Sequence, residues 1–309
     1  MRLFAFLAAD GPAVGLLTED DRVVRITAAD GGLDLALAEG RFDDVADEAL
    51  ARAAEPGVAR DALQPLPALE FPGKIVCIGL NYRDHIEEQH LDMPAQPTLF
   101  AKFGNTIVGD GEPIVRPEGT NALDLEVELG VVIGRRARRT SAAAAMDHVA
   151  GYLVVNDVTA RDWQGTKPAL AAGQRGDGQW LRAKGSDTFF PVGPVFVSAD
   201  EIPDPHALRL RSWRIPSSAS GAEPGTAIPM QDSTTADMVW RIPELIEYVS
   251  RQITLEPGDI LSTGTPAGVG VFQTPPVFLQ PGDRVRCEVE RIGWVENPVV
   301  DWTAAREDD

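Results

Sequence analysis

Several residue types are scarce in this chain, and each scarcity excludes a class of protein. Only two cysteines, Cys77 and Cys287, occur among 309 residues, and both lie in apolar stretches. A disulfide-stabilised secreted scaffold is therefore excluded, and the cysteines are predicted to be buried free thiols of a cytoplasmic protein. No apolar run reaches the length of a membrane span, about 18 residues. The apolar N-terminus, residues 1–9, is too short for the core of a secretory signal and is predicted to form a first strand.

Basic residues are scarce as well. The sequence holds 28 lysines and arginines against 47 acidic residues, which gives a net charge of −19. Without a basic stripe or interleaved aromatic and basic residues, nucleic-acid binding is not expected. Only four of the basic residues are lysines: Lys74, Lys102, Lys167 and Lys184. A lysine inside a motif is therefore a candidate for a role that needs a compact cation.

The most informative feature that is present is a strict alternation of apolar and acidic residues. Residues 123–129 read LDLEVEL, and strand geometry sends Asp124, Glu126 and Glu128 to one face and the leucines and valine to the other. Carboxylates gathered on one face repel each other and are costly to desolvate, and a hard cation such as Mg²⁺ or Mn²⁺ relieves both. An edge strand with a solvated acidic face explains the same pattern.

The residues that follow favour the metal site. The run 130–134 is apolar on both faces, which is typical of a strand buried on both sides. A second apolar strand begins at Gly151 and ends in Asn156 and Asp157. Asp157 is placed to supply a third carboxylate ligand. Alternatively, it caps a helix or lies in a turn.

A histidine and a glutamate form a second candidate group. Residues 83–90 are polar and follow a predicted strand at 74–79, so they are predicted to open a short helix. His85 and Glu88 are three residues apart and would share one face of that helix. A carboxylate beside an imidazole orients it as a general base that can activate water. A surface helix with scattered charge is the alternative.

Five segments together resemble the fumarylacetoacetate hydrolase superfamily, and they occur in the family's order from residue 74 to residue 299. They are residues 78–85 (IGLNYRDH), 125–129 (LEVEL), 151–164 (GYLVVNDVTARDWQ), 183–194 (AKGSDTFFPVGP) and 262–270 (STGTPAGVG). Each segment alone is a weak signal, but five in register are specific. The branch that they resemble contains acylpyruvate hydrolases and 2-hydroxyhepta-2,4-diene-1,7-dioate isomerases.

The resemblance implies three sets of site residues. The ligands of Mg²⁺ or Mn²⁺ would be Glu126, Glu128 and Asp157. The catalytic residues would be His85, Glu88 and, near the oxyanion, Lys184. The substrate-binding residues would be Arg161, Gln164 and Thr265. Asp124 has no counterpart among the family's ligands.

The resemblance also implies the architecture, a mixed, β-rich α/β fold with sheets rolled around the metal site, usually in a homodimer. Residues 1–63 are predicted as a small α+β domain with strands at 4–7, 13–17 and 22–26 and a helix at 42–54. A proline-rich linker at 64–73 would lead to a catalytic domain at 74–309. Further helices are predicted at 140–149, with Thr140 as N-cap, and at 242–251.

These parts predict a metal-dependent hydrolase that cleaves a carbon–carbon bond in a β-diketo or 2-oxo acid such as an acylpyruvate. The histidine–glutamate pair would activate a water, and Lys184 would stabilise the oxyanion. Enolate chemistry without the water gives the alternative, an isomerase, tautomerase or decarboxylase of a 2-oxo acid, a 2-hydroxydienoic acid or oxaloacetate. A non-catalytic metal or carboxylate binder and a calcium-stabilised structural domain are further alternatives.

Two stretches depart from the family pattern. Residues 165–180 are longer and richer in glycine than in compact members, which predicts a lid that orders when substrate binds. Residues 212–225 form a longer insert than the short hairpin of many members, and they bear on substrate size.

Overall fold

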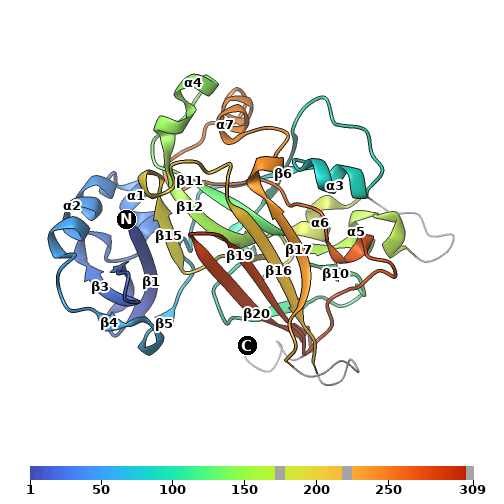
Figure 1. Cartoon of the computed structure of the whole chain (residues 1–309), viewed down its shortest axis with the longest axis horizontal. Coiled ribbons are helices and arrows are strands. Elements are labelled where there is room, and N and C mark those ends of the chain that lie inside the picture. The colour runs from blue at the N-terminus through green and yellow to red at the C-terminus, as the bar shows by residue number, and fades with distance from the viewer. Residues whose placement is uncertain (171–177, 218–224, 304–309) are drawn as a thin grey trace.

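The computed structural model describes residues 1–170, 178–217 and 225–303. Part of the predicted lid (171–177), part of the predicted insert (218–224) and residues 304–309 lie outside the described residues. The predicted mixed, β-rich α/β architecture is confirmed. Figure 1 shows the N-terminal strands at one end of the molecule and α3, α5 and α6 at the other.

An eleven-stranded sheet runs through the whole molecule. Its order is β4-β3-β2-β1-β15-β12-β11-β18-β6-β7, with β5 paired to β1. The strands are β1 (Arg2–Ala8), β2 (Gly11–Leu17), β3 (Arg22–Ile26), β4 (Val58–Ala59), β5 (Gln64–Pro65), β6 (Ile75–Gly79), β7 (Thr98–Lys102), β11 (Val127–Ile133), β12 (Val149–Asn156), β15 (Val195–Ser198) and β18 (Ile260–Ser262). The three predicted N-terminal strands are confirmed. Because β1 pairs antiparallel with β15, with Phe4 opposite Val195, these strands extend the sheet of the body. The division into domains at 1–63 and 74–309 stays a prediction.

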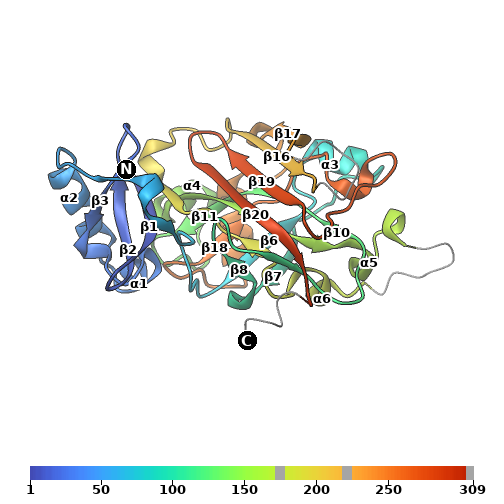
Figure 2. The same cartoon turned by 90° about the horizontal axis from the view of Figure 1, so that it is seen from below.

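A second sheet of five strands crosses the first (Figure 2). Its order is β17-β16-β19-β20-β9, formed by β17 (Ile228–Thr234), β16 (Arg209–Ile215), β19 (Arg284–Val289), β20 (Gly293–Asp301) and β9 (Ile114–Arg116). The main core lies between the two sheets, where Leu129 and Val131 belong to one apolar cluster with Cys287 and Val289. Two short pairs complete the strands, β10 (Leu123–Asp124) with β13 (Thr159–Ala160) and β8 (Ile107–Val108) with β14 (Phe190–Pro191).

The helices are short and lie at the margins of the sheets. They are α1 (Leu33–Ala38), α2 (Phe42–Arg52), α3 (Arg83–Glu88), α4 (Ala142–Ala145), α5 (Arg161–Gln164), α6 (Trp180–Lys184) and α7 (Ile242–Ser250). The helices predicted at 42–54 and 242–251 are confirmed as α2 and α7. The helix predicted at 140–149 is wrong in extent, because Val149 already begins β12 and pairs with Ile133. Ser141, not Thr140, precedes α4, and the N–H of Thr140 donates to Ser250 Oγ.

The acidic segment 123–129 is not one continuous strand, contrary to prediction. Asp124 pairs with Thr159 of β13, whereas Val127 pairs with Asn156 of β12. The ladder is interrupted between these pairs because its partner strand changes. The edge-strand alternative is wrong, since β11 lies between β12 and β18 and each of its residues is buried.

Candidate active site

Three buried carboxylates meet where β11 begins and β12 ends. Glu126 directly precedes β11, Glu128 lies within it, and Asp157 directly follows β12. The two strands are antiparallel neighbours, so the start of one adjoins the end of the other. One oxygen from each carboxylate lies within 4.8 Å of the other two. The structure therefore brings together the three residues that the sequence predicts as metal ligands.

Burial and mutual repulsion disfavour the charged form of Glu128. Burial raises the pKa of Glu128 well above its usual value, and the negative charges of Asp157 and Glu126 raise it further. Its Oε2 accepts hydrogen bonds from Ser262 Oγ at 2.5 Å and from the N–H of Gly264 at 2.9 Å. These two bonds fix the carboxylate but supply no positive charge.

Two cations hold Glu126 in its charged form. Lys184 Nζ lies 2.7 Å from Glu126 Oε2 and 2.7 Å from Asp157 Oδ2. Arg161 lies 2.7 Å from the other oxygen of Glu126 and 2.9 Å from Asp124 Oδ2. Burial opposes ionisation of Glu126, but the charges of Lys184 and Arg161 outweigh it and lower its pKa to about 2.

The donor set fits a hard divalent cation. Four buried acidic side chains (Asp124, Glu126, Glu128 and Asp157) face three buried basic ones (Lys102, Arg161 and Lys184), so acidic charge is in excess. The converging donors are all carboxylate oxygens, which Mg²⁺ and Mn²⁺ prefer. Asp124 is turned elsewhere, since its oxygens accept the N–H groups of Gly270 and Val271.

The predicted histidine–glutamate pair is formed. Helix α3 places His85 Nδ1 2.6 Å from Glu88 Oε1. The other oxygen of Glu88 accepts the N–H of Gly268 at 3.0 Å. Since Nδ1 is engaged, Nε2 is the ring nitrogen left to exchange a proton with a ligand.

Thr265 and Gln164 are held by neighbours inside the protein. The hydroxyl of Thr265 donates to the carbonyl of Val127 at 2.9 Å and accepts from Gln231 Nε2 at 2.7 Å. Gln164 Oε1 accepts from Thr166 Oγ1 at 2.9 Å. The hydroxyl hydrogen of Thr265 is thus already used in a hydrogen bond within the protein. Toward a ligand, this hydroxyl can only accept a hydrogen bond.

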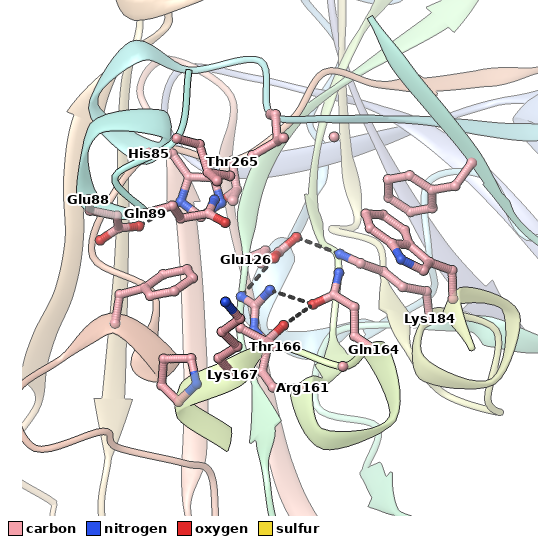
Figure 3. A pocket seen from close by; sticks show the side chains of 18 of the residues that line it. His85, Glu88, Gln89, Glu126, Arg161, Gln164, Thr166, Lys167, Lys184 and Thr265 are labelled. Atoms are coloured by element: carbon pink, nitrogen blue, oxygen red, sulfur yellow. Dashed lines mark hydrogen bonds and ion pairs between the residues drawn. The ribbon is translucent and has the colours of Figure 1, made fainter. Parts of the chain in front are cut away.

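A cavity of about 560 Å³ connects these groups (Figure 3). Eight of the nine predicted site residues line it: His85, Glu88, Glu126, Glu128, Arg161, Gln164, Lys184 and Thr265. Its apolar lining includes Ile78, Leu80, Leu91, Phe100, Trp180 and Phe272. The cavity therefore combines a polar floor with room for an organic ligand.

Lys167 is a pocket residue that the sequence interpretation missed. Figure 3 shows its ammonium group pointing into the cavity beside Arg161. Arg161 and Lys184 are paired with acidic side chains, whereas the side chain of Lys167 has no hydrogen-bond or ion-pair partner within the described ranges. The scarcity of lysine was the signal that could have found it.

Comparison with known proteins assigns the chain to a family. Residues 74–300 match the family model of the fumarylacetoacetate (FAA) hydrolase C-terminal domain, so the chain belongs to the fumarylacetoacetate hydrolase family. It is also 40% identical over 309 residues to a mitochondrial oxaloacetate tautomerase of Xenopus laevis, covering 97% of this chain and 90% of that protein.

Solved structures of related enzymes share the fold. One is 2-hydroxyhepta-2,4-diene-1,7-dioate isomerase from Mycobacterium marinum, with a TM-score of 0.70, 33% identity and coverage of 98% of this chain and 99% of that one. Another is maleylpyruvate hydrolase from Sphingobium sp. SYK-6 in complex with a manganese(II) ion and pyruvate, with a TM-score of 0.74, 28% identity and coverage of 97% and 99%. An enzyme that acts on a small molecule is consistent with these relatives. A homodimer and a cytoplasmic location stay predictions. Among the described residues, no helix is long and apolar enough to cross a membrane.

Proposed function

We propose that this protein is a divalent-metal-dependent enzyme that interconverts the enol and keto forms of oxaloacetate. The observation that carries the proposal is the 40% identity to an oxaloacetate tautomerase across nearly the whole chain. The chain also contains three clustered, buried carboxylates and a His85–Glu88 hydrogen bond. The findings favour this alternative over the carbon–carbon hydrolase that the sequence interpretation put first.

The reaction requires a stabilised enolate. Glu126, Glu128 and Asp157 would hold the divalent cation, which would supply Lewis-acid polarisation of the 2-oxo oxygen. Lys184 adds a buried positive charge beside Glu126 and Asp157. The cavity buries the reacting atoms, where such charges act more strongly than in water.

The proton transfers fall to His85. Its Nε2 takes the proton of the enol hydroxyl, and a proton then passes from Nε2 to C3 of the same molecule. The imidazole returns to its starting state, no bond between carbon atoms breaks, and no water is consumed. Glu88 keeps the imidazole in one orientation through the 2.6 Å contact with Nδ1.

A bound divalent cation and Lys167 together would offer two positively charged groups to a dicarboxylic acid. One carboxylate of oxaloacetate, next to the 2-oxo group, would lie at the carboxylate-bound cation. The second carboxylate needs another cation, and Lys167 points into the cavity with no acidic partner among the described residues. We place the distal carboxylate at Lys167.

The test must distinguish keto oxaloacetate, the product of tautomerisation, from pyruvate, the product of decarboxylation. Enol oxaloacetate is added to protein loaded with Mn²⁺, and the loss of enol absorbance and the release of pyruvate are followed together. Accelerated loss of enol without pyruvate is expected. Pyruvate formed at the rate of enol loss would instead indicate decarboxylation, and no acceleration would refute the proposal.

Hydrolysis of an acylpyruvate is the second candidate function. It is favoured by the His85–Glu88 pair, which can orient a water, and by the structural similarity to a maleylpyruvate hydrolase. Acetylpyruvate offered under the same conditions decides between the two, since a hydrolase releases pyruvate and acetate in equal amounts.

A further inference from the structure

Lys102 is a fully buried lysine that contacts Asp157, one of the three clustered carboxylates. It ends β7, and its side chain is 0% exposed. Its ammonium group meets four oxygen atoms: Asp157 Oδ1 at 2.8 Å and the carbonyls of Val158, Lys184 and Phe189 at 3.0, 2.6 and 2.6 Å. The rings of Phe189 and Phe190 lie with their centroids 5.8 Å away. An ammonium group is costly to bury, and these oxygen atoms and rings offset that cost.

The geometry explains why this position holds a lysine. Three carbonyls take the three N–H donors of one nitrogen, and Asp157 Oδ1 lies beside it as an ion-pair partner. A compact ammonium fits this arrangement, whereas a planar guanidinium has fixed donor directions. Elsewhere the chain uses arginine for positive charge, with only four lysines among 28 basic residues.

The contact with Asp157 determines which of its oxygens is offered to the site. Lys102 Nζ forms an ion pair with Oδ1 at 2.8 Å without hydrogen-bond geometry, whereas Oδ2 accepts a hydrogen bond from Lys184 Nζ at 2.7 Å. Rotation of the Asp157 carboxylate would lengthen this ion pair, so the charge of the ammonium favours one orientation of the ligand. Outer partners of metal ligands act in this way.

The same ammonium also fixes Lys184 from its backbone. The carbonyl of Lys184, the last residue of α6, accepts from Lys102 at 2.6 Å. The side chain of Lys184 then reaches back to Asp157 Oδ2. Lys102 thus holds both partners of the Asp157–Lys184 contact.

We propose that Lys102 is a positioning residue, which orients the Asp157 carboxylate for a divalent cation and fixes the backbone that carries Lys184. The first role does not depend on the reaction. The second rests on the proposed function, because it concerns turnover.

A simple counter-charge makes the opposite prediction for metal binding. If Lys102 only repelled a cation and balanced charge, its removal would strengthen divalent-metal binding. If it positions Asp157, its removal weakens that binding, by about 10- to 100-fold for a lost outer partner. The sign of the change therefore separates the two roles.

The test compares Lys102→Met and Lys102→Arg with the wild type by isothermal titration with Mn²⁺ on metal-stripped protein. Both variants are expected to bind Mn²⁺ more weakly, and the electron paramagnetic resonance spectrum of bound Mn²⁺ should change because the ligand geometry changes. Unchanged or tighter binding by Lys102→Met overturns the proposal. If Lys102→Met does not fold, Lys102→Arg decides, since it keeps the charge and a counter-charge would leave its Mn²⁺ affinity at the wild-type value.

Lys74→Met is the matched control. Lys74 also pairs with a fully buried aspartate, Asp259, at 2.7 Å, and neither residue lines the cavity. This variant should lose stability and keep its Mn²⁺ affinity. Weakened Mn²⁺ binding by Lys74→Met to the same degree would show a general effect of lost stability and overturn the proposal.

Turnover is measured separately at saturating Mn²⁺. The kcat of Lys102→Arg should stay below that of the wild type even when the site is full, because Lys184 is displaced. Full recovery of kcat would refute the second role alone. If the wild type itself does not tautomerise oxaloacetate, the proposed function fails while the metal-binding result stands.

Discussion

His85 Nδ1 lies 2.6 Å from Glu88 Oε1, and the second oxygen of Glu88 accepts the N–H of Gly268. One carboxylate therefore joins the imidazole to the loop that also carries Thr265. The pair is set in place by the fold, with a defined ring nitrogen left for proton transfer.

Replacing Glu88 by glutamine should remove activity and spare metal binding. The amide of Glu88→Gln can donate to Nδ1, which would leave the proton on Nε2 and block it as a base. The kcat should fall by about 100- to 10 000-fold, while the Mn²⁺ affinity by isothermal titration stays unchanged. Glu87→Gln, on the exposed side of α3, is the control and should behave like the wild type. Activity retained in Glu88→Gln would remove the pair from the mechanism.

Replacing Lys167 by methionine should impair recognition of a dicarboxylic substrate. Lys167→Met loses the cation that we place at the distal carboxylate, so KM for oxaloacetate should rise by about tenfold, with little change in kcat. Inhibition by oxalate, which resembles only the carboxylate and enolate end of the substrate, should not change. An equal loss for both ligands would argue against this placement.

The sequence predicts most of the candidate site residues, but it does not predict the contacts that hold them in place. Alternation in 123–129 places Asp124, Glu126 and Glu128 together as acidic candidates, because a period of two is a local property of a strand, and the family resemblance then selects Glu126 and Glu128. The interruption after Asp124 could not be predicted, since it arises from the change of partner from β13 to β12. Nor could the four contacts of Lys102, whose partners lie more than 50 residues away in the sequence.

His206 should make stability depend on pH. Its Nε2 accepts the N–H of Ile242, the first residue of α7, at 3.0 Å. Burial lowers the pKa of His206 below its ordinary value of 6.5, and Arg241 lowers it further, against the opposing charges of Asp204 and Glu244. The unfolded chain therefore binds more protons than the folded protein as pH falls below 6.5, and stability decreases with falling pH.

Urea unfolding at several pH values between 8 and 5 measures this effect. The free energy of unfolding should fall more steeply with acidification in the wild type than in His206→Gln, which has no titrating ring. Parallel pH profiles for the two proteins would contradict the assignment, because the other histidines are present in both.

Both cysteine thiols should be unreactive in the folded protein. Cys77 and Cys287 are free and buried, and burial raises the pKa of each thiol. A thiol-reactive dye should modify neither residue in native buffer and both in denaturant. Fast modification of one thiol in native buffer would show that its part of the core opens.

The measurement that tests the central claim most directly is a titration of metal-stripped protein with Mn²⁺, in which bound metal and the rate of enol oxaloacetate loss are followed together. We predict a rate that rises in proportion to occupancy and saturates at one ion per chain, with Glu126→Gln requiring more metal to reach the same occupancy. A full rate in the presence of a chelator, or no rate at full occupancy, would contradict the account.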